Sequence, residues 1–192
     1  MTPARLAKYK ATLACRQLDL TIITDQVNKT QNIAALIRTC DAVGIHRAHV
    51  VTPAGGFGDH KGTALGSQKW VNIMAHDTMN SALDTAKRQG MQLVSAHLSD
   101  LAIDYRELDY TLPTALILGA EMYGVSPSAL AASDHQVVIP MLGMCTRLTY
   151  LWRPPSYCLK LSVKESYRAV IVALNSWVQT TKKRYFVGVT PS

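Results

Sequence analysis

The stretch N-K-T-Q-N-I-A-A-L-I-R-T-C-D-A-V-G-I, residues 28–45, decides the fold expected for this chain. Its apolar residues recur at helical spacing, at Ile33, Leu36, Ile37, Cys40 and Val43. Gly44 is a typical residue after a helix end, so we expect a helix over residues 32–43. A β-branched run at residues 20–24 precedes this helix and predicts a strand. A strand followed by a helix is the repeating unit of α/β folds.

Two polar residues of this predicted helix are candidates for function. Asn32 lies near the helix start, where an asparagine also has a purely structural use as an N-cap. Arg38 lies between positions that are expected to be buried. Its structural alternative is a salt bridge from the helix edge to Asp41 or Asp25. For both residues the structural and the functional interpretation stay open on this pattern alone.

The alternation of strands and helices continues along the chain. Further strands are expected at residues 48–51, 71–74, 91–96, 114–118 and 136–139. Further helices are expected at residues 81–89 and 126–132, the second with Pro127 at its first position. Apolar strands that alternate with helices predict a parallel sheet. No linker or repeat divides residues 1–144, so we expect one α/β domain there.

Two further segments lie where α/β proteins bind ligands, beyond the carboxyl ends of parallel strands. L-I-L-G-A-E-M-Y-G-V-S, residues 116–126, places Glu121 between two glycines directly after a buried strand. Glycines there allow a ligand to approach the backbone closely. I-P-M-L-G-M, residues 139–144, follows the last predicted strand. The loop G-G-F-G at residues 55–58 does not match the dinucleotide-binding pattern G-x-G-x-x-G.

The composition argues against several classes of protein. A chain of 192 residues with 48% hydrophobic residues can bury the core of one compact domain. Its longest apolar runs are too short to cross a bilayer, and residues 1–10 lack the apolar centre of a signal peptide. The four cysteines form no C-x-x-C pair, which indicates a reduced, cytoplasmic protein without a metal site. The neighbouring His46 and His49 are interpreted as ordinary strand or surface residues.

The net charge of +7 is unevenly distributed. Residues 1–144 hold twelve basic and twelve acidic residues, so the whole excess lies in residues 145–192. The N-terminal segment, residues 1–18, contains no acidic residue, and its cations are Arg5, Lys8, Lys10 and Arg16. Such side chains could bind RNA phosphates, or they could belong to an ordinary solvated helix. Charge alone does not decide between the two.

The motifs together carry a family resemblance. The order N-x-x-A-x-x-R-T-x-D-A-x-G, L-x-L-G-x-E-x-x-G and I-P-M-x-G-M is similar to the SpoU/TrmH family of SPOUT RNA methyltransferases. The similarity runs from Tyr9 to Met144 and includes S-A-H-L-S-D at residues 95–100 and G-S-Q-K-W-V at residues 66–71. The resemblance implies a Rossmann-like parallel sheet with a trefoil knot. It also implies methyl transfer from S-adenosylmethionine to the ribose 2'-hydroxyl of a tRNA D-loop guanosine, at position 18 in tRNA numbering.

The resemblance also implies roles for single residues. Arg38 would stabilise the alkoxide that develops on the ribose, with action as a base the second option, because a guanidinium stays protonated. Asn32 would orient the ribose or Arg38, and Glu121 would shape the catalytic and cofactor loop. The cofactor would lie against Ala96, Gly119, Ile139, Met141 and Leu148.

The third motif stops at Met144. The family continues with V-x-S-L-N-V-S-V-A-x-A and a helix, which complete the knot, bind the cofactor and form the homodimer. This chain instead reads C-T-R-L-T-Y-L-W-R-P-P-S-Y-C at residues 145–158, and only Leu148 coincides with the family pattern. Pro154 and Pro155 would interrupt the required helix. We therefore expect an incomplete knot and find no basis for the family's homodimer.

A change of reading frame explains this break. From Met144 onward, the third base of each codon can be joined to the first two bases of the next. The permitted residues then include V-H-S-L-N-V-S-V-A, followed by S-A-I-L-L-F-E-A-Q-R-Q-R, which is the family pattern in register. We interpret residues 145–192 as an out-of-frame tail that follows the loss of one nucleotide, and we discount their charge as a sign of RNA binding.

Three functions stay open on the sequence. The intact first and second motifs favour a working tRNA ribose methyltransferase. The broken third motif favours an inactive remnant of that enzyme with at most RNA-binding ability. An unrelated nucleotide-binding α/β domain is the third option, and it would require a glycine-rich phosphate loop at a helix start, which the sequence lacks.

Overall fold

The fold is a parallel α/β sheet, as the sequence predicts. The computed structural model describes residues 1–27, 29–52, 66–120 and 123–139. In these ranges seven strands pair in parallel in the order β3-β2-β1-β6-β4-β7-β5. The strands are β1 (Gln17–Asp25), β2 (Ile45–Val51), β3 (Asn72–His76), β4 (Gln92–Ala96), β5 (Ile103–Asp104), β6 (Thr114–Gly119) and β7 (His135–Val138). The predicted knot falls on residues outside the described ranges.

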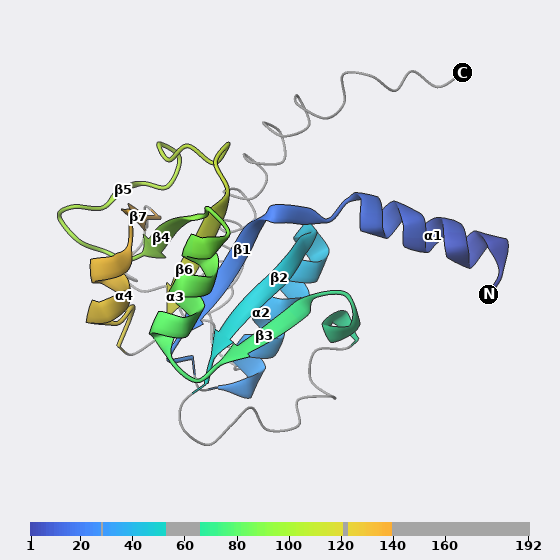
Figure 1. The fold of residues 1–192 in the computed structure, drawn as a ribbon, viewed down its shortest axis with the longest axis horizontal. Coiled ribbons are helices and arrows are strands. Elements are labelled where there is room, and N and C mark those ends of the chain that lie inside the picture. The colour runs from blue at the N-terminus through green and yellow to red at the C-terminus, as the bar shows by residue number, and fades with distance from the viewer. Residues whose placement is uncertain (28, 53–65, 121–122, 140–192) are drawn as a thin grey trace, which may run out of the picture.

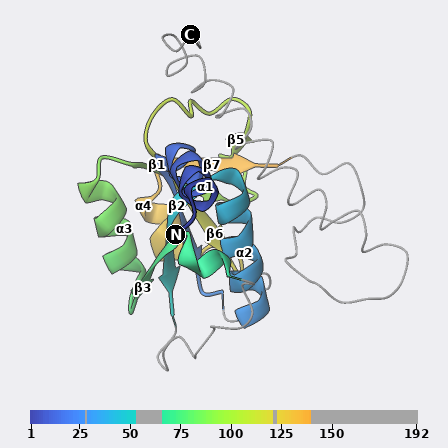
Figure 2. The same ribbon diagram turned by 90° about the vertical axis from the view of Figure 1, so that its right-hand side faces the viewer.

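Helices cover both faces of the sheet. They are α1 (Pro3–Ala14), α2 (Thr30–Val43), α3 (Met79–Arg88) and α4 (Pro127–Ala132), with a 3-10 turn at Ser67–Lys69. Figure 2 shows α2 on one face of the sheet and α3 with α4 on the other. Pro127 is the first residue of α4 after the N-cap Ser126, as predicted. None of the helices in the described ranges is long and apolar enough to cross a bilayer.

Two apolar clusters hold these layers together. The predicted stripe of α2, including Ile37 and Cys40 at 1% exposure each, packs on Ile22 and Val50 of the sheet. On the other face, Leu83 of α3 belongs to a cluster with residues of β1, β4, β6 and α4. Burial on both faces explains why apolar residues stand on both sides of one strand, as Ile22 and Ile23 of β1 do.

The start of α2 differs from the prediction. The helix begins at Thr30, with Lys29 at the cap position and no side-chain cap bond. Asn32 therefore lies inside the first turn, where it is 5% exposed. Its structural interpretation as an N-cap is wrong, because an N-cap residue must precede the helical backbone.

Helix α1 stands apart from the sheet (Figure 1). None of its residues is buried. The ring of Tyr9 packs on Trp70 with centroids 5.3 Å apart. Directly after the helix, Arg16 donates to Asp41 at 2.5 Å and to the carbonyl oxygen of Ile45 at 3.3 Å. The Arg16 side chain is only 5% exposed, so it fastens α1 to the domain. Of the N-terminal cations considered for RNA binding, Arg16 is therefore not available to a phosphate.

Candidate active site

Four neighbouring strands end at one edge of the sheet, and their ends carry the predicted cofactor residues. Asp25 at the end of β1 is in register with Gly119 at the end of β6, and Ala96 of β4 is in register with Val137 of β7. Ile139 directly follows β7. Gly119, Ala96 and Ile139 are half-buried, so none of them is wholly covered by the core. The structure thus brings these three residues to adjacent strand ends.

The turn after β6 needs both of its glycines. Ala120 and Gly124 exchange two backbone hydrogen bonds, of 3.0 and 2.7 Å. A Cβ atom on Gly119 would lie 2.1 Å from the Gly124 carbonyl carbon, and Gly124 itself has a φ of 69°. Any other residue at Gly119 would push the two ends of the turn apart. Glu121, within this turn, lies outside the described residues, as do Met141 and Leu148.

Asp25 closes the same turn from the side of β1. It is 1% exposed, and one of its carboxylate oxygens accepts a hydrogen bond of 2.6 Å from the backbone N–H of Ser126. The sequence pattern suggests Asp25 only as an ion-pair partner for Arg38. One feature of the sequence could have indicated this role: Asp25 is an acidic residue at the end of the β-branched run of β1. A carboxylate that is buried at such a position must accept a hydrogen bond from some donor.

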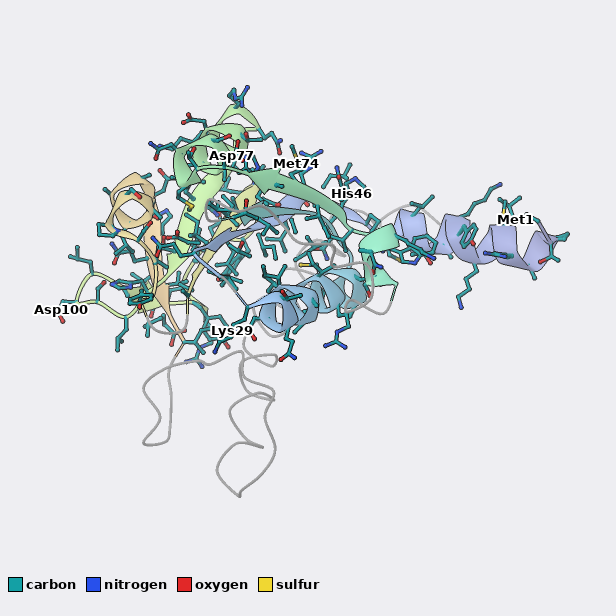
Figure 3. All side chains as sticks on the ribbon, turned by 90° about the horizontal axis from the view of Figure 1, so that it is seen from below. Met1, Lys29, His46, Met74, Asp77 and Asp100 are labelled. Carbon is teal, nitrogen blue, oxygen red and sulfur yellow. The ribbon has the colours of Figure 1, made fainter. Side chains whose placement is uncertain are left out.

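Helix α2 presents Asn32 and Arg38 in different directions. Four residues separate its start from the end of β1, and Figure 3 labels Lys29, the residue directly before it. Six residues turn a helix by about 600°, which leaves the two side chains about 120° apart. Accordingly Asn32 is buried and Arg38 is exposed. The structure does not place these two side chains on one face of α2.

Arg38 makes no ion pair with either carboxylate that the sequence suggested. Asp41 pairs with Arg16, and Asp25 accepts from the Ser126 backbone. The interpretation of Arg38 as a salt-bridge partner of Asp41 or Asp25 is therefore wrong. Because the guanidinium is exposed and pairs with no carboxylate of the described residues, it is free to approach an anionic group of a substrate.

The N-terminal cations lie away from this edge. Arg5, Lys8 and Lys10 are exposed on α1, and the Arg5 Nε atom donates to the Tyr9 hydroxyl at 2.7 Å. Helix α1 leads into the amino end of β1, whereas the site lies at its carboxyl end. A nine-residue strand spans about 30 Å. The structure therefore separates these cations from the residues at the site.

A buried histidine pair lies on the α3 face of the sheet, near the ends of β2 and β3. His49 Nδ1 is 2.9 Å from His76 Nε2, and His76 Nδ1 is 3.1 Å from the Ser81 hydroxyl. His49 is fully buried, so its interpretation as an ordinary strand residue holds, but its partner is His76 and not His46. Burial, with the nearby His76 and Arg47, lowers the pKa of His49 to about 4. Within the described ranges, no three possible metal ligands come together.

Comparison with known proteins identifies the family. The sequence model of the SpoU rRNA methylase family matches residues 19–148. The tRNA (guanosine(18)-2'-O)-methyltransferases of Escherichia coli and Thermus thermophilus are 45% and 44% identical over 148 and 147 residues, each 77% of this chain. The crystal structure of an Aquifex aeolicus TrmH/SpoU tRNA-modifying enzyme superposes with a TM-score of 0.76 at 30% identity. It covers 98% of this chain and 89% of the other. The chain belongs to the SpoU methylase family.

The resemblance stated from the motifs is thereby confirmed. The aligned parts correspond to 65% of the E. coli protein and 76% of the T. thermophilus protein. The chain thus spans about two thirds of the length of the E. coli relative. The family match ends at residue 148, close to the point where the third motif breaks off.

Proposed function

We propose that the site at the carboxyl edge of β1, β6, β4 and β7 is that of a tRNA guanosine-2'-O-methyltransferase. The observation that carries this proposal is the meeting of two motif segments at one sheet edge. Helix α2, with Arg38 exposed, starts beside the strand whose end holds the Gly119–Gly124 turn. The relatives at 44–45% identity, named as methyltransferases of guanosine 18, support the same substrate. We place the reaction in the cytoplasm, with tRNA as the substrate.

The residues at the strand ends fit S-adenosylmethionine. Gly119, Ala96 and Ile139 are uncharged and half-buried at neighbouring strand ends, and an adenosine placed there would meet apolar atoms and backbone groups. When bound, this cofactor supplies an electrophilic methyl group on a sulfonium. Transfer of that methyl group to the ribose 2'-hydroxyl would leave the cofactor's sulfur as a thioether and the hydroxyl proton on a solvent water, because Arg38 stays protonated.

Arg38 assists this step without acting as the base. Its guanidinium stabilises the negative charge that develops on the ribose oxygen and is held near it by a neighbouring phosphate. Asn32, buried in the first turn of α2, orients the helix start and through it the ribose. Glu121 shapes the turn between Gly119 and Gly124. Arg5, Lys8 and Lys10 hold a more distant part of the tRNA by phosphate contacts.

A second candidate function is that of an inactive remnant that binds tRNA. The observation that favours it is the end of the family match at residue 148, beside the predicted frame change after Met144. In that case residues 1–144 keep the first two motifs, and the chain lacks the sequence that completes the cofactor site. Restoring one nucleotide after the Met144 codon should then restore the activity.

The test compares the chain as printed with the frame-restored chain. Each is incubated with tritiated S-adenosylmethionine and a tRNA transcript, and methyl transfer to guanosine 18 is measured. A transcript with 2'-deoxyguanosine at that position should accept no methyl group. Transfer by both chains supports the enzyme, whereas transfer by the restored chain alone supports the remnant. The proposal fails if neither chain methylates the tRNA.

Arg38→Ala tests the assigned role in whichever chain is active. Removal of one charge-stabilising donor typically lowers kcat about 100-fold or more. Arg88→Ala is the matched control, because Arg88 is also an exposed helical arginine but lies at the end of α3. Equal losses from the two substitutions would contradict a catalytic role for Arg38.

A further inference from the structure

We propose that Asp25 is a positioning residue that locks the Gly119–Gly124 turn in its working geometry relative to α2. The proposal rests on the function proposed above. It arises from one long-range contact, the 2.6 Å hydrogen bond from the Ser126 backbone to the Asp25 carboxylate, which joins residues 101 positions apart.

The turn is fastened at two points. Its own closure comes from the paired backbone bonds of Ala120 and Gly124. Its exit is held by Val125, which is 4% exposed in the apolar cluster under α3 and α4, and by the Asp25–Ser126 bond. The first closure fixes the shape of the turn, but it does not fix where the turn sits on the sheet. The Asp25 carboxylate supplies that second constraint, because Asp25 belongs to the neighbouring strand.

The same carboxylate lies close in sequence to the start of α2. Gln26 follows it with a φ of 55°, so the chain turns sharply there. Val27 then returns to the core at 6% exposure, and α2 begins at Thr30. A short connection of four residues thus joins Asp25 to the helix that carries Arg38. A hydrogen bond from Asp25 to the far side of the turn therefore couples the two motif segments.

The choice of a carboxylate strengthens this coupling. A charge-assisted bond from a backbone N–H is shorter and stronger than a neutral one. At 1% exposure Asp25 has little competing water, and loss of the bond would leave the N–H of the half-buried Ser126 without this acceptor. The expected consequence is a displaced turn in an otherwise folded protein.

A matched carboxylate at the opposite edge of the sheet provides the control. Asp134, just before β7, accepts a 2.7 Å bond from the backbone N–H of Leu93 near the start of β4. Its chemistry is the same, but the amino ends of these strands are remote from the site. Asp25→Ala and Asp134→Ala therefore each remove one carboxylate bond to a backbone N–H, the first from the buried working edge and the second from the remote edge, where Asp134 is exposed.

Hydrogen–deuterium exchange on the full chain tests the contact independently of activity. Asp25→Ala should speed exchange of the Gly124 and Ser126 amides at least tenfold, and Asp134→Ala should leave them unchanged. Asp25→Asn should restore slow exchange, since its amide oxygen can accept the same bond. Unchanged exchange in Asp25→Ala would overturn the proposal, whatever the chain's activity.

In an active form of the chain, kinetic measurements then distinguish a positioning role of Asp25 from a role in stability alone. Asp25→Ala should lower kcat at least tenfold with less than a threefold change in KM for tRNA, and Asp25→Asn should recover most of the rate. If Asp25→Ala does not fold, Ser126→Pro removes the donor at a φ of −65° that proline accepts, and Ser126→Ala keeps the donor. Equal kcat for these two serine variants would contradict the proposal. If the chain shows slow exchange but no methyl transfer, only the proposed function fails.

Discussion

Helices α1 and α2 have similar lengths, 12 and 14 residues, but the domain holds them in opposite ways. Seven residues of α2 are buried, whereas none of α1 is. Leu6 and Leu13 of α1 remain 41% and 60% exposed. Packing on the sheet accounts for this contrast, because an isolated helix of this length is marginal in water. The helix with the catalytic candidates is part of the core, and the helix with the RNA candidates is an appendage.

The largest expected effect comes from breaking the buried helix. Ile37→Ala should lower the free energy of unfolding by about 2–5 kcal/mol, because it leaves a cavity under α2. The matched change on the exposed helix, Leu13→Ala, should cost less than about 0.5 kcal/mol. Urea unfolding followed by circular dichroism measures both. Similar costs would show that α1 is packed in solution.

The buried interior should also make stability depend on pH. His49 has a pKa of about 4 in the folded chain, against about 6.5 when unfolded, because of burial and the neighbouring His76 and Arg47. Burial also lowers the pKa of His76, which Asp77 partly offsets. Between these values the unfolded chain binds more protons, so stability is full above pH 6.5 and falls as the pH drops towards 4.

For His49 alone this effect should amount to about 3 kcal/mol at pH 4, and the lowered pKa of His76 adds to it. Unfolding titrations between pH 8 and pH 4 should show the loss in the unsubstituted chain and a smaller loss in His49→Leu. His46→Gln is the control, since His46 lies on the same strand but is not part of the pair. A pH dependence that survives unchanged in His49→Leu would assign it to other groups.

The ends of the two helices meet at Gly44. Its φ of 85° is left-handed, and a Cβ atom there would lie 2.6 Å from the carbonyl oxygen of Cys15, which follows α1. Gly44→Ala should therefore cost about 2 kcal/mol or more, from backbone strain and this contact together. Gly90→Ala has a similar φ of 69° but no neighbour within 4 Å, so only the strain of about 1 kcal/mol remains. Equal costs in thermal unfolding would refute the contact.

The smallest effect on stability is expected from the cations of α1. Lys8→Ala with Lys10→Ala should leave unfolding unchanged, since both side chains are exposed. It should weaken tRNA binding and reduce the slope of log affinity against log salt by about 1.5. Filter binding at several salt concentrations measures this, with Lys87→Ala plus Arg88→Ala on α3 as the control. The same slope in both double variants would argue against α1 as the RNA contact.

The apolar pattern predicted the fold well, because periodicity reports burial directly. The stripe from Ile33 to Cys40 packs as expected, and Pro127 begins α4. Helix starts were harder to predict. Helix α2 begins at Thr30 after Lys29, which makes no side-chain cap bond that would mark the position. The two-residue strand β5 (Ile103–Asp104) was not predicted, because such a short strand is defined only by its pairing with β7.

The motifs name candidate site residues one at a time, but they do not predict where two distant segments of the chain meet. The contact of Asp25 with Ser126 joins parts of the chain that share no local pattern. His49 was compared with His46 because they are close in sequence, but residues three apart on a strand face opposite sides. The parallel pairing of β2 with β3 instead brings His76 to it.

The position of β6 in the sheet has a consequence for how the chain folds. Strands β1, β2 and β3 follow one another in the sequence and lie side by side, so they can pair as soon as they are synthesised. Strand β6 must later enter between β1 and β4, and pairings between distant segments form slowly. During synthesis, β1 therefore stays unpaired on one side until β6 has been made. Asp25 can meet Ser126 only at the end of that process, so the site is among the last parts of the domain to assemble.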